Sequence, residues 1–444
     1  MTIIQDLGGG LVLRHGTPDD IEALADFNSY IHKDFGTTDP ANEIGWWTRD
    51  LMRGTHPTTQ ASDFLIVEDT STGAIASTTS LISQVWKYGG IPFKVGRPEL
   101  VATNADYRNK GLVRAQFDVL HRWSAERGEL AQAITGIRYY YRQFGYEMTL
   151  NMPARRVGYR INIPALKEGE PEPYMVREAT DDDIPFIMSL VAEGDKRYFI
   201  TLQTDETYWR YQMHHLSEGS YLNSRFCIIT TLDGKPIGAL GHTSKLSRGT
   251  ISVSLYELAQ GVRWAAVTPT VLRYLGKMGE QYEERALRDK KPAFGAYVFE
   301  MGDTHPVYDI IRSRLPRKTP SYTYFMRVPD IPAFIRHVAP VFEARLAASI
   351  FAEHTGELKF NFYRSAFKMT FAEGKVGAES YTPTHQDDGD VFFPAHTFLH
   401  LLFAHLELDD LERVFPDCWA AGDEARALTK TLFPRQDSLA IPLS

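Results

Sequence analysis

The chain has 444 residues and a formal net charge of −8, from 48 Lys and Arg against 56 Asp and Glu. This length predicts two to four domains, and the acidic balance argues against nucleic acid as a partner. The composition, 43% hydrophobic and 23% charged, is that of an ordinary soluble globular protein, and no apolar stretch is long enough to cross a bilayer. Two distant cysteines, Cys227 and Cys418, suggest no disulfide framework. The first ten residues lack the pattern of a signal peptide, so we expect a cytoplasmic protein without a membrane partner.

The first predicted elements alternate between strands and helices. Residues 11–14 read as a strand, and Thr17 is a good cap for the helix that follows. A second helical segment covers residues 43–53. Residues 64–68 and 74–83 alternate between apolar and polar side chains, which predicts two strands joined by a turn.

The most informative stretch covers residues 99–146. An extended run at 99–103 leads into a basic loop with Gly111, and a helix follows to about residue 127. The first turn of a helix leaves backbone N–H groups unpaired, and a glycine there allows close approach of an anion. Arg108, Lys110 and Arg114 add positive charge. The pattern therefore predicts a phosphate site.

The order of motifs in this stretch resembles the acetyl-CoA core of the GNAT superfamily of N-acetyltransferases. Arg108-x-x-Gly111-x-Val113 opens the helix, a buried strand covers residues 130–134, and Tyr141-Arg-Gln-Phe-Gly145-Tyr follows. The family loop reads Gln/Arg-x-x-Gly-x-Gly/Ala, so Val113 departs from its last position. The resemblance implies acetyl-CoA as cosubstrate and acetyl transfer to a primary amine, carried by a small molecule or an exposed lysine.

The resemblance also assigns site residues. Tyr141, four residues before Gly145, takes the place of the family's general acid; the alternative is that it is a core aromatic. The backbone positions that match the family's cofactor contacts are Val101, Ala102 and Thr103 for pantetheine, Asn109, Lys110, Gly111, Leu112, Val113 and Arg114 for the diphosphate, and Gly136 and Ile137 after the next strand.

A diverged internal repeat organises the next part of the chain. Residues 13–21 are echoed by residues 176–184 with Arg, Thr, Asp, Asp and Ile at an offset of 163. Residues 170–327 are therefore predicted to be a second copy of the fold, after a linker rich in Pro, Glu and Gly at 167–173. Its Arg273-x-x-Gly276 has apolar neighbours at helical spacing, so we expect it inside a helix rather than at a phosphate site.

From residue 328 the pattern changes again. An amphipathic helix over 329–351, strands at 357–363 and 366–372, and helices at 394–405, 409–414 and 422–432 are similar to a sterol-carrier-protein-like domain. Duplicated GNAT units followed by such a domain are the architecture of the enhanced-intracellular-survival (Eis) acetyltransferases. The predicted fold class is thus α+β: tandem GNAT-like mixed-sheet domains at 1–165 and 170–327, then a sterol-carrier-protein-like α/β domain at 328–444. The resemblance also implies a homo-oligomer, a hexamer.

Several assignments stay open at this stage. The resemblance makes the C-terminal carboxylate of Ser444 the candidate base, with simple packing of the apolar tail as the alternative; Glu99 is a second candidate, more readily interpreted as a solvated strand end. Phe35, Trp46, Trp47 and Trp86 are either acceptor-pocket or core aromatics. His396 and His400 do not make a convincing metal site, and none is predicted. The competing function is a non-catalytic acyl-CoA- or lipid-binding protein with residues 328–444 as the carrier.

Overall fold

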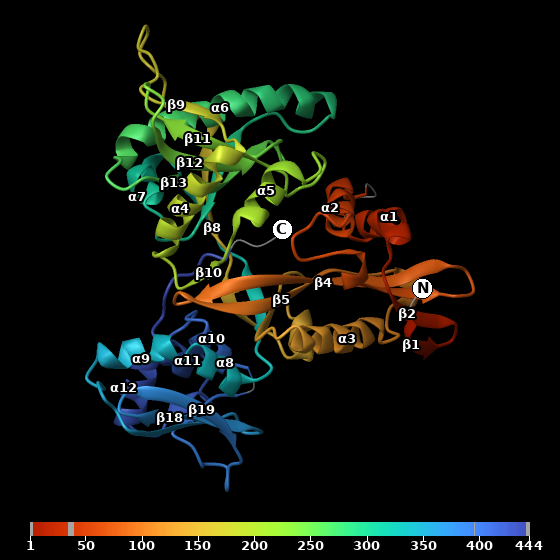
Figure 1. The fold of residues 1–444 in the computed structure, drawn as a ribbon, viewed down its shortest axis with the longest axis vertical. Coiled ribbons are helices and arrows are strands. Elements are labelled where there is room, and N and C mark those ends of the chain that lie inside the picture. The colour runs from red at the N-terminus through yellow and green to blue at the C-terminus, as the bar shows by residue number, and fades with distance from the viewer. Residues whose placement is uncertain (1–2, 34–39, 395, 441–444) are drawn as a thin grey trace.

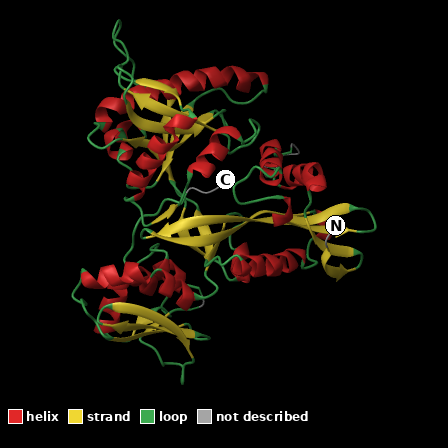
Figure 2. Ribbon diagram, in the orientation of Figure 1, coloured by secondary structure: helices red, strands yellow, loops and turns green. Residues whose placement is uncertain are grey.

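The computed structural model describes residues 3–33, 40–394 and 396–440. Within them the strands form three sheets, each covered by helices, and the class is mixed α+β as predicted. Figures 1 and 2 show a central unit around the long strands β4 and β5, a unit with helix α6 on one side, and a unit with helices α8 to α12 on the other. No helix in these residues combines the length and the apolar character needed to cross a bilayer.

The first sheet has the order β1-β2-β3-β4-β5-β6-β16-β7, with β10 also paired to β4. Helices α1 and α2 lie on one face of this unit and α3 on the other (Figure 1). Strand β4 extends five residues beyond its predicted end at Ser83, and β1 was not predicted. The bounds are β1 (Ile3–Gly8), β2 (Leu11–His15), α1 (Ile21–Ile31), α2 (Asn42–Met52), β3 (Phe64–Asp69), β4 (Ala74–Tyr88), β5 (Ile91–Thr103), α3 (Leu112–Glu126), β6 (Ala131–Ile134), β7 (Glu147–Asn151), β10 (Ile200–Leu202) and β16 (Thr323–Arg327).

The second sheet has the order β15-β8-β14-β13-β12-β11-β9. Its elements are β8 (Ala154–Tyr159), β9 (Met175–Glu178), α4 (Ile184–Asp195), α5 (Glu206–His214), β11 (Ser224–Thr230), β12 (Pro236–Thr243), β13 (Thr250–Leu258), α6 (Trp264–Arg288), β14 (Ala296–Met301), α7 (Val307–Ile310) and β15 (Arg317–Thr319). Short 3₁₀ helices in the first two units lie at Pro18–Asp20, Ala61–Asp63, Ala105–Tyr107, Tyr140–Phe144, Arg160–Asn162, Asp181–Asp183 and Arg312–Arg314.

The residues that recur in the repeat stabilise the same turn in both copies. Arg14 forms an ion pair with Asp20 at 2.8 Å, and the repeat-related Arg177 pairs with Asp183 at 2.7 Å. In each copy the aspartate also accepts a hydrogen bond from the backbone of the capping threonine at 2.8 Å. The recurrence therefore reflects a conserved local fold at the start of α1 and α4.

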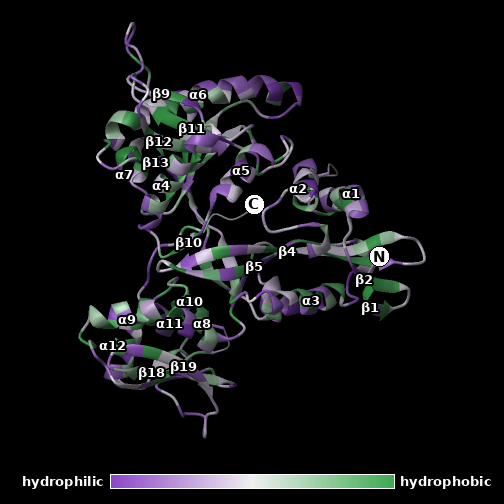
Figure 3. Cartoon of the chain, in the orientation of Figure 1, coloured by the Kyte–Doolittle hydropathy of each residue, from purple (hydrophilic) through white to green (hydrophobic). Residues whose placement is uncertain are grey.

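Arg273 and Gly276 lie inside α6, as expected. Arg273 pairs with Glu172 at 2.6 Å rather than facing an anion site. The later turns of α6 are strongly hydrophilic in Figure 3, so this helix projects one polar side into solvent.

Two strands are exchanged between the first and second sheets. Strand β8 lies inside the predicted first domain but pairs with β14 in the second sheet. Strand β16 lies inside the predicted second domain but inserts between β6 and β7 of the first sheet. The sheets thus cross the predicted boundaries near 165 and 327. The pattern of a five- or six-residue strand carries no information about which sheet it joins, because that pairing is long-range.

The third sheet has the order β19-β18-β17-β20-β21. The prediction of one helix over 329–351 was wrong: it is two helices separated at Val338, with Pro340 in the first turn of the second. The predicted helix at 394–405 is shorter, and β19 was missed. The bounds are α8 (Ile331–His337), α9 (Ala339–Ala347), β17 (Gly356–Asn361), β18 (Ala366–Ala372), β19 (Lys375–Tyr381), β20 (Val391–Phe392), α10 (Phe398–Leu402), α11 (Leu408–Val414), β21 (Trp419–Ala420) and α12 (Asp423–Leu432).

The third unit packs against the far end of β4 and β5 through a shared apolar core. Tyr88, at the end of β4, is fully buried and donates a hydrogen bond to the Leu402 carbonyl at 2.7 Å. Its ring lies 5.4 Å from that of Phe334 on α8. The strands that carry the candidate site at one end are therefore anchored in the C-terminal unit at the other.

Candidate active site

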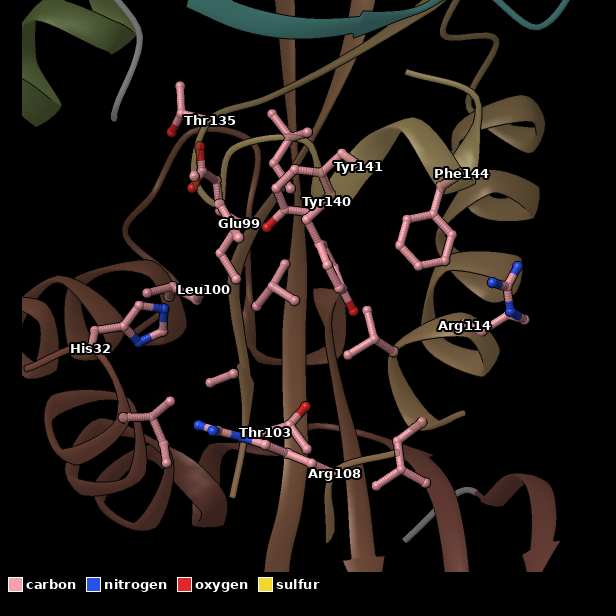
Figure 4. A pocket seen from close by; sticks show the side chains of 18 of the residues that line it. His32, Glu99, Leu100, Thr103, Arg108, Arg114, Thr135, Tyr140, Tyr141 and Phe144 are labelled. Carbon is pink, nitrogen blue, oxygen red and sulfur yellow. The ribbon is translucent and has the colours of Figure 1, made fainter. Parts of the chain in front are cut away.

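The candidate site is a cavity where two parallel strands separate. Strands β5 and β6 pair at Val95 with Ala131 and at Gly96 with Gln132. Beyond these pairs, residues 99–103 of β5, the last residue of β6 and the loop at 135–137 line a cavity of about 850 Å³ (Figure 4). Separated strands leave backbone N–H and C=O groups unpaired by the sheet, so this cavity can hydrogen-bond an extended ligand.

A β-bulge in β5 shapes the upper wall of this cavity. The register with β4 shifts between Thr78 and Ser80, and Leu100 has a φ of +54°. The Glu99 carbonyl accepts hydrogen bonds from Thr79 Oγ1 at 3.1 Å and Ser80 Oγ at 3.2 Å, which hold the irregular backbone in place. A bulge bends its strand and re-aims the side chains next to it, as it does here for residues 99–101.

The three predicted pantetheine positions, Val101, Ala102 and Thr103, all line the cavity. Their strand is fixed to α3 through Ser77. The Ser77 hydroxyl lies 2.8 Å from Thr103 Oγ1 and 2.8 Å from Gln116 Oε1 on α3. This buried contact sets the distance between the extended wall and the helix that carries the anion site.

The predicted diphosphate turn is open. All six residues from 109 to 114 line the cavity. Gly111 caps α3 with a φ of +75°, and a Cβ added to it would meet no atom within 4 Å. Asn109 also has a positive φ, +63°. The backbone therefore presents the first N–H groups of α3 to free space, the arrangement that binds phosphate.

Three cationic side chains surround the turn. Arg108, Lys110 and Arg114 all line the cavity. Arg114 donates to Gln143 Oε1 at 3.1 Å and lies over the Phe144 ring at 5.2 Å, so its position is fixed by the segment that carries Tyr141. The electrostatic character of this end of the cavity is positive, which suits a diphosphate.

Tyr141 lies at the other end of the cavity, in the 3₁₀ helix Tyr140–Phe144. The residue is 3% exposed, and its ring packs between Phe117 at 5.9 Å and Phe325 at 5.5 Å. Gly136 has a φ of +134°, and a Cβ added there would lie 3.3 Å from the Tyr141 hydroxyl oxygen. Gly136 thus lets the phenol sit directly against the backbone of the cavity wall. Phe325 comes from the exchanged strand β16, so the second half of the chain helps to hold this ring.

The environment keeps the phenol protonated. Burial raises the pKa of Tyr141 above its ordinary value, and the neighbouring Glu99 carboxylate raises this pKa further. Figure 4 shows the two side chains beside each other at the upper end of the cavity. A group with these neighbours can donate a proton to a developing anion at neutral pH.

Glu99 is not a solvated strand end, so that interpretation was wrong. It is 8% exposed, lines the cavity and forms an ion pair with the fully buried Arg97. Burial raises the pKa of Glu99, and the Arg97 guanidinium opposes that shift. The bulge at Leu100 brings this carboxyl inward, and no pattern in the sequence signalled it.

The apolar tail is docked as far as the structure describes it. Leu439 N donates to the Ile200 carbonyl at 2.8 Å, and Ala440 is fully buried. The docked tail therefore continues the strand pairing of β10, which itself pairs with β4. Ser444, the predicted base, lies outside the described residues.

The other residues considered in the sequence analysis lie partly in the cavity lining and partly outside it, and some lining residues were not predicted. Gly136 and Ile137, which were predicted to contact the cofactor, line the cavity. Of the four aromatics considered for an acceptor pocket, Trp47 lines the cavity, Trp86 is fully buried core, Trp46 is outside the cavity lining, and Phe35 is not described. Lining residues that sequence reasoning missed are Ile31, His32, Ile44, Leu100, Tyr107, Ile134, Thr135, Tyr140, Gln143, Phe144 and Tyr221.

Tyr221 shows why some of these could not be found from sequence. It belongs to the loop before β11 in the second repeat, and it reaches the first cavity through packing between the two units. The histidines, by contrast, form no metal centre in the described residues: His400 Nδ1 lies 2.9 Å from His405 Nδ1, and no group of three metal-ligating side chains occurs there.

Comparison with known proteins agrees with this geometry. Residues 13–149 match the model of an acetyltransferase (GNAT) domain. No curated protein matches the sequence significantly. Together with the structural neighbours described next, the domain match supports an N-acetyltransferase.

Solved structures share the fold along the whole chain. A probable N-acyltransferase from Enterococcus faecalis superposes with a TM-score of 0.65 at 11% identity, covering 97% of this chain and 99% of that one. A GCN5-related N-acetyltransferase from Kribbella flavida gives 0.65 at 15% identity, with 98% of each chain covered. Eis1 from Mycobacterium abscessus gives 0.61 at 12%, covering 98% of this chain and 99% of that one. At these identities the likeness is one of fold.

Proposed function

We propose that this protein transfers the acetyl group of acetyl-CoA to a primary amine, carried by a small molecule or an exposed lysine. The observation that carries the proposal is one continuous cavity with an open helix N-terminus at one end and the Tyr141 phenol at the other. An anion site and a proton donor, joined by a strand with free backbone groups, are what a long thioester with a diphosphate needs.

The residues present fit acetyl-CoA. The turn at 109–114 has room for a diphosphate because a Cβ at Gly111 would meet nothing, and Arg108, Lys110 and Arg114 supply counter-charge. Val101, Ala102 and Thr103 would pair with the pantetheine arm, and Gly136 and Ile137 form the wall opposite. Acetyl-CoA, when bound, supplies an acyl group activated as a thioester.

Tyr141 is the general acid in this proposal. Its hydroxyl donates a proton to the sulfur that leaves when the amide forms, and its buried position keeps that proton in place until then. The C-terminal carboxylate of Ser444 is the proposed base for the incoming amine. The docking of the tail up to Ala440 supports this role, and Glu99, already in the cavity, is the alternative base.

We further propose that the protein is of the Eis type: a catalytic GNAT domain at 1–165, a degenerate copy at 170–327 and a sterol-carrier-protein-like domain at 328–444, assembled as a cytoplasmic hexamer. The end-to-end likeness to Eis1 supports this organisation. A lipid-carrier role has less support, because aromatic rings fill the interior of the C-terminal unit. Phe360 stacks on Phe367 at 4.6 Å and contacts Phe398 at 5.1 Å.

The test is to incubate the protein with acetyl-CoA and a panel of primary amines, to measure free thiol, and to identify the acetylated amine by mass spectrometry. We expect thiol release that depends on a particular amine. Tight binding of acetyl-CoA with no thiol release for any amine or lysine peptide would contradict the proposal and favour the binding-protein alternative.

A further inference from the structure

The second repeat contains a cavity at the place that corresponds to the first site. Strands β13 and β14 pair in parallel from Thr250 with Ala296 to Val253 with Phe299. Beyond these pairs a cavity of about 280 Å³ opens between them, and helices α4 and α5 cover it as α1 and α2 cover the first. The duplication has therefore kept a gap between separating strands in the copy that lost the diphosphate turn.

The charge of this cavity is opposite to that of the first. Three carboxylates line it, from Asp195, Glu257 and Glu300, and no lysine, arginine or histidine is found among its described lining residues. The cations that pair with these carboxylates are not among the lining residues: Lys87 lies 3.4 Å from Asp195, Arg155 lies 2.9 Å from Glu300, and Arg197 pairs with Glu257. The charged side chains that line this space are thus all acidic, although each has a cationic partner outside the lining.

Burial makes the charge of Asp195 costly. The pKa of Asp195 is raised by burial, and the Glu257 carboxylate raises it further against the opposing effect of Lys87. A cation bound between these carboxylates would relieve both effects. Among the described residues, the cation that opposes them is Lys87, which is not part of the cavity lining.

A buried side chain of the cavity lining also has a donor without a partner. Gln212, on α5, lines the cavity and is 8% exposed. Its Nε2 has no hydrogen-bond partner among the described residues. An unsatisfied buried N–H group is unfavourable, so a ligand oxygen that accepts from it would be stabilised.

The remaining walls are apolar and aromatic. Trp209 and Phe226 meet edge to face with ring centroids 5.3 Å apart, and Leu255 and Met301 also line the cavity. Leu439 of the docked tail adds a further apolar contact. Aromatic faces of this kind bind both flat apolar groups and adjacent cations.

We propose that this cavity is a second ligand site, separate from acyl transfer, that binds a small primary amine with an aromatic or apolar body and an oxygen acceptor. The ammonium group lies against Asp195, Glu257 and Glu300, the body packs on Trp209 and Phe226, and the oxygen accepts from Gln212. The second cavity shares the lining residue Tyr221 with the first, but its assignment does not depend on the function proposed there.

Tyramine is a suitable probe, because 4-ethylphenol lacks its ammonium group and phenethylamine lacks its oxygen. Binding to the full chain is measured by calorimetry without acetyl-CoA. We expect tyramine to bind about tenfold or more tightly than either analogue. Equal binding of 4-ethylphenol would overturn the assignment of a cation, equal binding of phenethylamine would overturn the Gln212 contact, and no tyramine binding would overturn the site.

Matched variants test which of the two cavities binds tyramine. Gln212→Met removes the amide at similar length, and Ser254→Phe fills the second cavity, whereas Ile44→Trp fills the first. We expect the first two to weaken tyramine binding tenfold or more and Ile44→Trp to leave it unchanged. The opposite pattern would place the amine in the first cavity and refute the proposal. Thermal unfolding checks that each variant is folded, and Gln212→Met suffices if Ser254→Phe is not.

Discussion

Replacing Tyr141 by Phe tests the proposed general acid separately from the packing of the aromatic ring. The change keeps the packing against Phe117 and Phe325, at 5.9 and 5.5 Å, and removes one oxygen. No described residue hydrogen-bonds to that hydroxyl, so the fold loses no such contact. We therefore expect the free energy of unfolding to change by less than about 0.5 kcal/mol.

The expected loss of activity is far larger. A positioned general acid contributes about 10²- to 10⁴-fold to rate, which corresponds to roughly 3 to 5 kcal/mol of transition-state stabilisation. The dissociation constant for acetyl-CoA should stay within about twofold of wild type, because the diphosphate turn is at the other end of the cavity. The assay is thiol release at saturating amine, with acetyl-CoA binding measured separately by calorimetry.

Tyr139→Phe is the matched control. Tyr139 is two residues away, 75% exposed and outside the cavity lining, so its variant should retain wild-type activity. Should Tyr141→Phe release thiol as fast as wild type on an amine that responds, the assigned acid is wrong. Equal losses in both variants would indicate a structural effect of the segment instead.

Further predictions test the cavity walls and the pH dependence. Gly136 has a φ of +134°, and a Cβ added there would lie 3.3 Å from the Tyr141 hydroxyl oxygen. Gly136→Ala should therefore destabilise the fold by about 1–3 kcal/mol and lower kcat. An unchanged melting temperature and an unchanged kcat would argue against the close approach. Arg108→Ala should weaken acetyl-CoA binding several-fold, about 1 kcal/mol, and reduce its salt dependence; calorimetry at two salt concentrations decides this. Glu99→Ala should cost about 3 kcal/mol in chemical denaturation, because it removes the carboxylate that pairs with buried Arg97. Burial raises the pKa of Tyr141 above its ordinary value of about 10, so the acid keeps its proton as the pH rises toward 10. The rate should therefore not decline at any pH up to about 10. A descending limb of the pH–rate profile near about pH 8 would contradict this.

Most of the site residues that could be predicted from the sequence belong to local motifs. The turn at 109–114, Gly136 and Tyr141 lie within 33 residues of one another, and each depends on a backbone conformation or helix start that nearby residues specify. The structure brings all of them to one cavity. The repeat was visible for the same reason, since Arg14 and Asp20 form a local pair that Arg177 and Asp183 reproduce.

Long-range features were not readable. The exchange of β8 and β16 depends on pairings across more than 130 residues, and Tyr221 reaches the first cavity from the second repeat. The inward position of Glu99 depends on a β-bulge, which the alternation of apolar and polar side chains does not predict. In each case the determining contact joins segments whose patterns are individually ordinary.

The most direct test of the account is a crystal structure of the protein with coenzyme A. We predict the diphosphate on the backbone amides of residues 109–114, the pantetheine arm along residues 101–103, and the sulfur within hydrogen-bonding distance of the Tyr141 hydroxyl. Coenzyme A bound elsewhere, or bound here with its sulfur pointing away from Tyr141, would contradict the proposed mechanism.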